Sequence, residues 1–170
     1  MQTNILLTLL CLTALRLLHA DESQLYRPVA EIPIGGEGGW DILETDANAH
    51  RVYVSHAFRV VVVDTGKNTV LGEIADTPGV HAFVIAPELQ RGFSSNGKEN
   101  KVSVVDLQTL KTTGKVETGE SPDAMVYDPK HSEVYVFNQK GNSSTVIDAK
   151  STKVVSTIPL GGSPEFAALD

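Results

Sequence analysis

The sequence predicts an all-β fold made of repeated four-stranded units, and three observations support this prediction. The tripeptide Val-Val-Asp at 104–106 recurs 42 positions later as Val-Ile-Asp at 146–148. Segments between turn-forming residues alternate apolar and polar residues, which is the two-residue period of a β-strand. After the N-terminal segment, no window has the period of an amphipathic helix. A fixed period of about 40 residues is typical of stacked repeat architectures.

Each predicted unit contains four short strands in the same order. A run of small apolar residues follows a loop with Gly or Pro, and an alternating strand then ends in Asn or His. A Val-rich strand next ends in Asp, and a fourth strand leads into the following loop. The alternating strands lie at 51–56, 91–96 and 133–138. Four antiparallel strands in each unit of about 42 residues form the blade of a β-propeller.

Aromatic residues recur at one position of the alternating strand, as Tyr53, Phe93 and Tyr135. Because blades diverge as they leave the central channel, large side chains are needed to fill the space between them. We therefore expect these three rings to pack between neighbouring blades.

The repeats predict three complete units and part of a fourth. The units span about 37–78, 79–120 and 121–162, and 163–170 begin the next unit as its innermost strand. Residues 29–36 match 155–162, so we expect them to form the outermost strand of a unit with its exit loop. An outermost strand at the start and an innermost strand at the end indicate the N-terminal part of a longer propeller.

The repeated segments resemble the YVTN-repeat (YncE-like) family of secreted bacterial β-propellers. The resemblance rests on Tyr-Val-Ser-His at 53–56, Phe-Ser-Ser-Asn at 93–96 and Tyr-Val-Phe-Asn at 135–138, with the Asp-terminated strands and Gly-Gly-Ser-Pro-Glu at 161–165. It extends from about Val29 to the end of the sequence. It implies a seven-bladed protein, often without an assigned activity, so the parent chain would have roughly 330 residues.

Residues 1–20 have the features of a cleaved secretory signal peptide. The apolar run Ile5–Leu15 is too short to span a membrane, and the small residue Ala20 precedes the polar residues from Asp21 onward. The remaining chain, 21–170, contains no cysteine, because Cys11 is the only one. We expect a periplasmic or extracellular bacterial protein with no membrane span after cleavage.

The charge balance argues against two classes of partner. The formal net charge is −7, and an acidic surface repels nucleic-acid phosphates. The sequence also lacks a basic amphipathic stretch that would hold it on an anionic membrane. The remaining expected partners are an unidentified small molecule or another protein.

The candidate ligand-binding residues begin the innermost strands. Asp41, His81, Asp123 and Glu165 occupy equivalent positions after the blade-connecting loops, so we expect a partial ring at the channel mouth. Such a ring could bind a divalent cation or a polar ligand. Alternatively, each side chain could cap its own turn by accepting backbone N–H bonds.

Further candidates lie near the same end of the blades. Trp40 follows the glycine-rich segment 35–39 and could stack on a ligand, plug the channel or cover the end of a blade. His56, Asn96 and Asn138 end the alternating strands, and we expect them on the same face as the ring.

No catalytic residue, metal ligand or cofactor can be assigned from the sequence. Trp40-Asp41 opens an inner strand and is not a WD signature, and the glycines at 35–39 lack the spacing of a dinucleotide-binding loop. We expect a secreted, non-catalytic propeller that serves as a ligand- or protein-binding platform. The alternative is a metal-dependent lactonase-like hydrolase with its site at the channel mouth, and a quinoprotein subunit is a more distant third.

Overall fold

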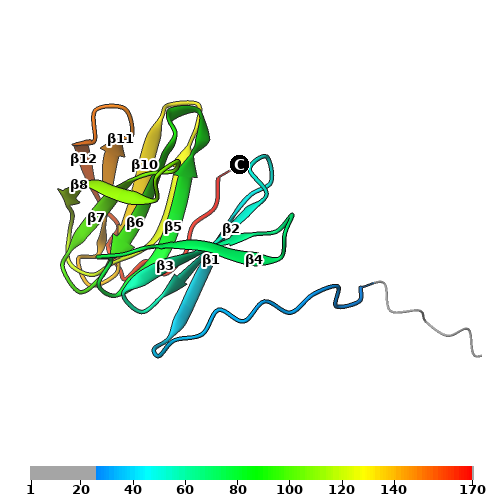
Figure 1. The fold of residues 1–170 in the computed structure, drawn as a ribbon. Coiled ribbons are helices and arrows are strands. Elements are labelled where there is room, and N and C mark those ends of the chain that lie inside the picture. The colour runs from blue at the N-terminus through cyan, green and yellow to red at the C-terminus, as the bar shows by residue number, and fades with distance from the viewer. Residues whose placement is uncertain (1–25, 170) are drawn as a thin grey trace, which may run out of the picture. The chain divides into compact units, whose positions relative to one another are not determined.

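The computed structural model describes residues 26–169, and these are almost entirely β-structure (Figure 1). Two units are distinguished, Met1–Glu31 and Ile32–Asp170. In the first unit, residues 26–31 contain no strand or helix, and the expected signal peptide at 1–20 lies outside the described residues. The fold described below is that of the second unit.

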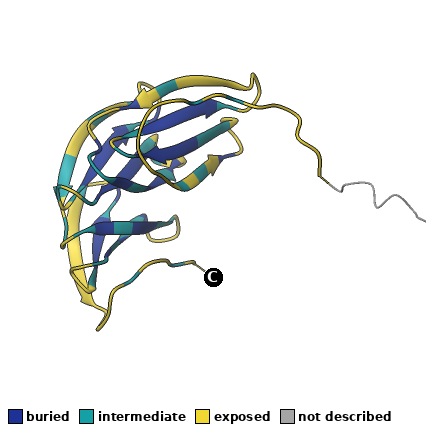
Figure 2. Cartoon of the chain, turned by 90° about the horizontal axis from the view of Figure 1, so that it is seen from below, coloured by how far each residue is buried: buried dark blue, intermediate teal, exposed yellow. Residues whose placement is uncertain are grey.

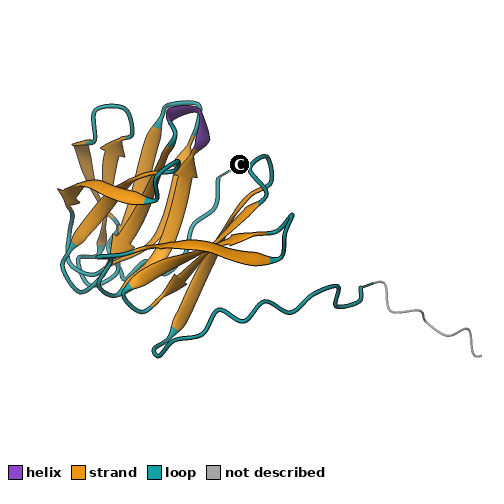
Figure 3. Ribbon diagram, viewed as in Figure 1, coloured by secondary structure: helices purple, strands orange, loops and turns teal. Residues whose placement is uncertain are grey.

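The second unit contains three antiparallel sheets whose strands follow the order of the sequence (Figures 1 and 3). The first sheet comprises β1 (Trp40–Asp46), β2 (Arg51–His56), β3 (Arg59–Asp64) and β4 (Thr69–Ile74). The second comprises β5 (Val80–Ala86), β6 (Arg91–Asn96), β7 (Lys101–Asp106) and β8 (Lys111–Glu117). The third comprises β9 (Pro122–Asp128), β10 (Glu133–Asn138), β11 (Ser143–Asp148) and β12 (Lys153–Pro159). The expected four-stranded blades are thereby confirmed.

Helical structure among residues 26–169 is limited to the 3₁₀ helix η1 (Pro87–Leu89), drawn purple in Figure 3. It lies between β5 and β6, where Gln90 adopts a left-handed conformation with φ of 52° and turns the chain into the next strand. No helix in this part of the chain has the length and apolar character that crossing a bilayer would require.

The strand registers repeat from blade to blade, which shows that the predicted alignment of the units is correct. Trp40 lies opposite His56, Val80 opposite Asn96, and Pro122 opposite Asn138. The register between the first and second strands of each blade shifts close to this position, so the same β-bulge recurs in all three blades. Equivalent sequence positions therefore occupy equivalent places at one end of the blades.

We expected all three aromatic residues to pack between blades, and two of them do. The Tyr53 ring stacks on Phe83 of the second blade, with ring centroids 4.8 Å apart. Phe93 is buried in a cluster with residues of the third blade, including Met125 and Val134. Tyr135 is only partly buried, because the described residues contain no fourth blade to cover it, and its hydroxyl donates to Glu133.

The middle strands are the most buried, and the outermost strands are largely exposed (Figure 2). The middle strands β3, β7 and β11 each contain four consecutive buried residues, whereas every residue of β12 is exposed. The inner strands β1, β5 and β9 pack side by side. Their equivalent ends therefore come close together.

The two terminal segments differ from the expectation. Residues 29–36 form no strand, although Ile32 and Ile34 pack against the apolar face formed by Val54, Val61 and Val63. Residues 163–169 also form no strand. Residues 163–169 lack a described strand to pair with. Each inner strand forms its hydrogen bonds with the second strand of its own blade, and the described residues contain no such second strand for 163–169.

Candidate functional site

Three of the predicted ring residues meet where the inner strands begin. Asp41, His81 and Asp123 are each the second residue of their strand, in β1, β5 and β9. The loops before them contain backbone positions with positive φ, including Gly79 at 66° and Ser121 at 55°. These sharp turns direct each strand into the channel at the same level.

His81 connects the two aspartates. Its Nδ1 lies 2.8 Å from Asp41 Oδ2 and 3.9 Å from Asp123 Oδ1. Because a carboxylate only accepts hydrogen bonds, Nδ1 of His81 carries the hydrogen atom and donates a hydrogen bond to Asp41. The other side of the ring lies against Gly97, where an added Cβ would come within 2.9 Å of Nε2. The hydrogen bond of Asp41 therefore runs to the next blade and not to its own turn.

The environment of Asp123 disfavours a negative charge. Burial is the largest cause that raises the pKa of its carboxyl group, and the charges of Asp41 and Glu165 raise it further. Attraction to His81 acts in the opposite direction without cancelling the rise. Asp41 and Glu165 thus lie near enough to affect Asp123, with His81 as the opposing group.

Glu165 lies close enough to affect Asp123 but has a different partner. Its Oε1 accepts a hydrogen bond of 2.8 Å from Nε2 of Gln139, which follows β10. Glu165 belongs to the segment 163–169, which forms no strand. The expected ring is therefore a close group of Asp41, His81 and Asp123 with Glu165 beside it.

Trp40 covers the end of its own blade with one ring face. The indole stacks on the His56 imidazole, with centroids 3.6 Å apart and planes within 7° of parallel. Nδ1 of His56 lies 3.0 Å from the Gly39 carbonyl oxygen, and Gly38, at φ of 111°, passes against Ala57. Trp40 remains 51% exposed, so its second face is open.

Trp40, Asp41 and His81 line the same cavity. In a regular strand, adjacent side chains such as Trp40 and Asp41 point to opposite faces. The register shift between Trp40 and Leu43 interrupts that alternation. The cavity has a volume of about 300 Å³, and Lys98 and the backbone around Gly79 complete its wall. It combines an aromatic face, a carboxylate, an imidazole and an ammonium group.

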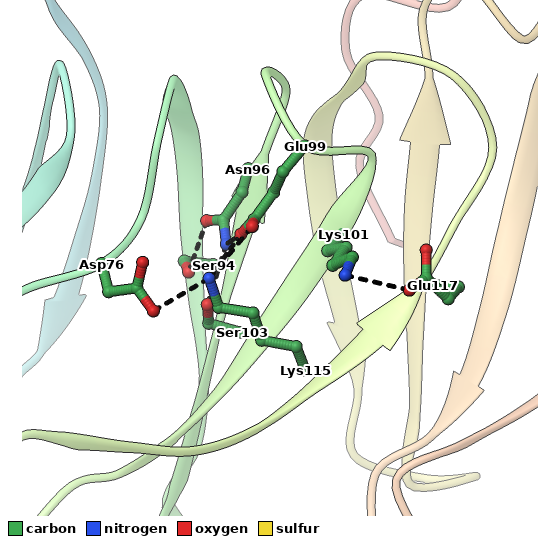
Figure 4. A network of polar contacts seen from close by, with 8 residues as sticks. All are labelled: Asp76, Ser94, Asn96, Glu99, Lys101, Ser103, Lys115 and Glu117. Carbon is green, nitrogen blue, oxygen red and sulfur yellow. Dashed lines mark hydrogen bonds and ion pairs between the residues drawn. The ribbon is translucent and has the colours of Figure 1, made fainter.

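The three residues that end the alternating strands were expected on the same face as the ring, but their side chains lie inside the blades. His56, Asn96 and Asn138 are the last residues of β2, β6 and β10, and all three are fully buried. Asn96 Nδ2 donates to Ser103 Oγ at 2.8 Å and to Glu99 Oε1 at 2.7 Å. The network continues from Glu99 to Lys115, which also pairs with Asp76 (Figure 4).

Asn138 repeats this arrangement in the third blade. Its Nδ2 donates to Ser143 Oγ at 3.0 Å and to Thr145 Oγ1 at 2.9 Å. The first blade has Val61 where the others have Ser103 and Thr145, and there His56 replaces asparagine. Asn therefore occurs together with Ser or Thr in the neighbouring strand, whereas His occurs together with Val. This correlation in the sequence indicates that the Asn side chains form hydrogen bonds inside the blade.

Two residues at the mouth were not predicted from the sequence. Lys98 lines the cavity beside Trp40, and Gln139 binds Glu165. Both lie in the hairpin tips that follow Asn96 and Asn138. The repeat register could have identified them, because these tips lie at the same end of the blades as the start of each inner strand.

A second cavity of about 540 Å³ runs along the inner strands. It is lined mainly by apolar side chains, among them Ile42, Val84 and Met125. At its edge, the Tyr127 hydroxyl donates to Glu88, and burial together with this bond raises the pKa of Tyr127 to about 12. The polar groups at this edge thus bind each other.

Within residues 26–169, no group of three or more His, Asp or Glu side chains is arranged to hold a metal ion. The close group at the mouth provides carboxylates and one imidazole for hydrogen bonds and charge pairing. This chemistry suits the binding of a polar or charged small molecule.

The propeller architecture is shared with solved structures of low sequence identity. Hydrazine synthase from Kuenenia stuttgartiensis matches with a TM-score of 0.67 and 22% identity, over 71% of this chain and 36% of that one. AztD from Citrobacter koseri matches with a TM-score of 0.62 and 19% identity, over 82% of this chain and 40% of that one. The apo form of AztD gives a TM-score of 0.61. The chain thus spans well under half the length of these proteins, and the likeness concerns the fold alone.

No curated protein sequence matches the chain. The family model described as YNCE-like beta-propeller, however, matches residues 44–169, from within β1 through the third blade and the segment that follows it. Together with the repeated strand registers and the three four-stranded blades, this match shows that the chain belongs to the YNCE-like β-propeller family.

Proposed function

We propose that this protein is a secreted, non-catalytic propeller that binds a small polar ligand at the channel mouth. One observation carries the proposal: Trp40 and Asp41 of the first blade and His81 of the second line one cavity of about 300 Å³. Ligand pockets typically combine an apolar wall with a few convergent polar groups. This cavity has that composition, and Asp123 supports it from the third blade through its proximity to His81.

The position of the cavity also supports binding. Its residues come from two blades, and the mouth gathers side chains that are far apart in the sequence, as binding sites in repeat proteins do. Trp40 departs from the repeat, because Val80 and Pro122 occupy the equivalent positions in the other blades. Stacking on His56 accounts for one face of this large aromatic, and its exposed second face is a feature that packing of the blade does not require.

Secretion forms part of the proposal, with the predicted signal peptide at 1–20 as its support. The alternative, a lactonase-like hydrolase, has no specific observation in its favour, and we do not propose it. Expression with the complete N-terminus in a bacterial host, followed by mass determination of the exported protein, would test cleavage after Ala20.

Ligand binding can be followed through Trp40, because it is the only tryptophan in the sequence. We expect its fluorescence to respond, in a saturable manner, to at least one member of a panel of small cationic, zwitterionic, neutral and anionic compounds. The response should weaken in Asp41→Asn and persist in Glu117→Gln, which alters an exposed carboxylate on β8. If no compound class changes the fluorescence, the proposed binding function is wrong.

A further inference from the structure

The charges at the mouth are the starting point for assigning a ligand class. Asp41 and Asp123 gather there around His81, at 2.8 Å and 3.9 Å from its Nδ1, and Glu165 lies near enough for its charge to affect Asp123. The opposing groups are His81, which Asp41 and Asp123 share, and Lys98, which lies on an exposed hairpin tip. Asp41 is the carboxylate in the cavity wall and Lys98 the ammonium group; with Asp123 and Glu165 nearby, carboxylates outnumber ammonium groups at the mouth, which favours cations.

Asp41 has capacity for a further partner. Its Oδ2 accepts from His81 at 2.8 Å, yet the side chain is 41% exposed. An ionised carboxylate accepts about four hydrogen bonds, so one bond from an imidazole leaves most of its acceptor positions free. The free positions belong to a residue that lines the cavity.

Trp40 supplies a second, independent interaction. The His56 ring covers one indole face and fixes the orientation of the side chain, while half of the residue remains exposed. The open face of an indole carries negative electrostatic potential and is the strongest aromatic binder of cations. An inorganic ion gains little there because it holds its water tightly, whereas an alkylammonium group sheds water readily.

We propose that the channel mouth binds an organic cation, with an alkylated ammonium group placed between the open face of Trp40 and the carboxylate of Asp41. This assignment rests on the proposed binding function and adds the ligand class to it. Burial is the largest cause of the raised pKa of Asp123, and the charges of Asp41 and Glu165 add to it, which agrees with several carboxylates lying near one another at the mouth.

The proposal can be tested on the unmodified chain with two probes of nearly the same shape. Choline carries a trimethylammonium group, and 3,3-dimethyl-1-butanol replaces its nitrogen with carbon and is neutral. In a titration followed by Trp40 fluorescence, we expect choline to bind at least about tenfold more tightly than the neutral compound, as a cation–π contact with a charge pair implies. Equal binding of the two, or tighter binding of the neutral compound or of acetate, would overturn the cation assignment.

Two substitutions at the cavity provide effects of opposite sign. Asp41→Asn should weaken choline binding by about tenfold, and Lys98→Ala should strengthen it, since that change removes the competing positive charge. Glu117→Gln, on the outer strand β8, should leave choline binding unchanged. Weakening by Lys98→Ala together with no effect of Asp41→Asn would indicate an anion site and contradict the proposal.

The outcomes also separate this inference from the proposed function. If choline fails to bind while another class from the panel binds in a way that depends on Asp41, the cation assignment is wrong and the binding function stands. If no probe of any charge changes Trp40 fluorescence, both are wrong. The comparison of choline with its neutral analogue needs no variant, so poor folding of Asp41→Asn would not prevent the test.

Discussion

The guanidinium group of Arg51 donates a hydrogen bond of 2.7 Å to the backbone carbonyl oxygen of Leu107. Arg51 begins β2 of the first blade, and Leu107 follows β7 of the second, so the bond crosses from blade to blade. Arg91 repeats the contact one blade later, with the carbonyl oxygen of Ala149 at 2.7 Å. The third blade has Glu133 at this position, and Glu133 accepts from Tyr135 instead.

We predict that Arg51→Ala lowers the free energy of unfolding by about 1–3 kcal/mol, because it removes a charge-assisted hydrogen bond to a backbone carbonyl. Urea denaturation followed by circular dichroism measures the change. Lys67→Ala, which removes an exposed cation next to Asp64, serves as the control and should have an effect of less than about 1 kcal/mol. If both substitutions lowered the free energy of unfolding equally, the hydrogen bond of Arg51 would contribute no more than an exposed surface charge.

A second prediction concerns Gly92 in β6. An added Cβ would overlap the Phe83 ring and approach Leu107 Cδ2 within 3.0 Å, and both side chains are buried. Gly92→Ala should therefore destabilise the protein by about 1–3 kcal/mol through overpacking. Gly114→Ala in β8 is the matched control, since nothing lies within 4 Å of its added Cβ. A thermal melt of both variants checks this, and unchanged melting of Gly92→Ala would disprove the steric explanation.

The aspartates that end the Val-rich strands make stability depend on acid pH. Thr109 N donates to Asp106 Oδ1 at 2.7 Å, and Lys67 N donates to Asp64 Oδ1 at 2.9 Å. These backbone bonds are the main cause that lowers the pKa of both carboxyl groups. A lowered pKa stabilises the fold above the unfolded value of about 4, and this stabilisation is lost as the pH falls through the folded value.

We therefore expect the contribution of these two carboxyl groups to the urea midpoint to be constant from about pH 7 to 5 and to be lost below about pH 4. Asp106→Asn keeps an acceptor for the turn but cannot ionise, so the variant should lose less stability between pH 5 and 3 than the wild type. Parallel pH profiles of the two proteins would mean that Asp106 does not contribute to the acid dependence.

Asp123 should behave in the opposite manner. Because burial raises the pKa of its carboxyl group, ionisation costs more free energy in the folded state than in the unfolded chain, which destabilises the fold where the carboxyl is ionised. We predict that Asp123→Asn leaves the free energy of unfolding at pH 7 unchanged or increases it. The difference from the wild type should vanish as the pH falls below about 4, where the unfolded carboxyl is also protonated. Marked destabilisation at pH 7 would indicate that the charge of Asp123 holds the blades together.

The last prediction concerns metal ions. We expect Ca²⁺, Mg²⁺, Mn²⁺ and Zn²⁺ to leave the melting temperature unchanged relative to a chelator, because His81 shares Asp41 and Asp123 while Gln139 binds Glu165. Thermal melts of the wild type, Asp123→Asn and Glu165→Gln make the comparison. A rise in melting temperature that both substitutions abolish would establish a metal site and restore the hydrolase alternative.

The fold could be predicted because its strands are short, regular and repeated. The period of about 42 residues aligned His56, Asn96 and Asn138, and the structure places each of them at the end of the second strand of its blade. The terminal segments could not be predicted in this way, because pairing and not propensity decides whether a strand forms. Residues 163–169 have the sequence of an inner strand without the neighbour that would complete its hydrogen bonds.

The candidate site was predictable in position but not in contacts. Asp41, His81 and Asp123 occupy equivalent positions in the repeat, so the sequence alone predicted that they lie at the same end of three strands. The repeat could not reveal that His81 donates to the preceding blade, because that bond depends on rotamers and on the spacing between blades. It also could not distinguish the buried Asn96 from an exposed ligand-binding residue, since burial depends on the polar partner Ser103 in the neighbouring strand.

The pairing order of the strands has a consequence for how the chain folds. Every hydrogen-bonded pair within a sheet joins strands that are consecutive in the sequence, from β1 with β2 through to β11 with β12. Closing each hairpin therefore involves only a short loop, which keeps the entropy of loop closure small. Contacts between blades, such as those of β1 with β5 and β5 with β9, span one repeat. Folding can thus begin in any blade and spread to its neighbours, faster than in β-proteins whose paired strands are distant in sequence.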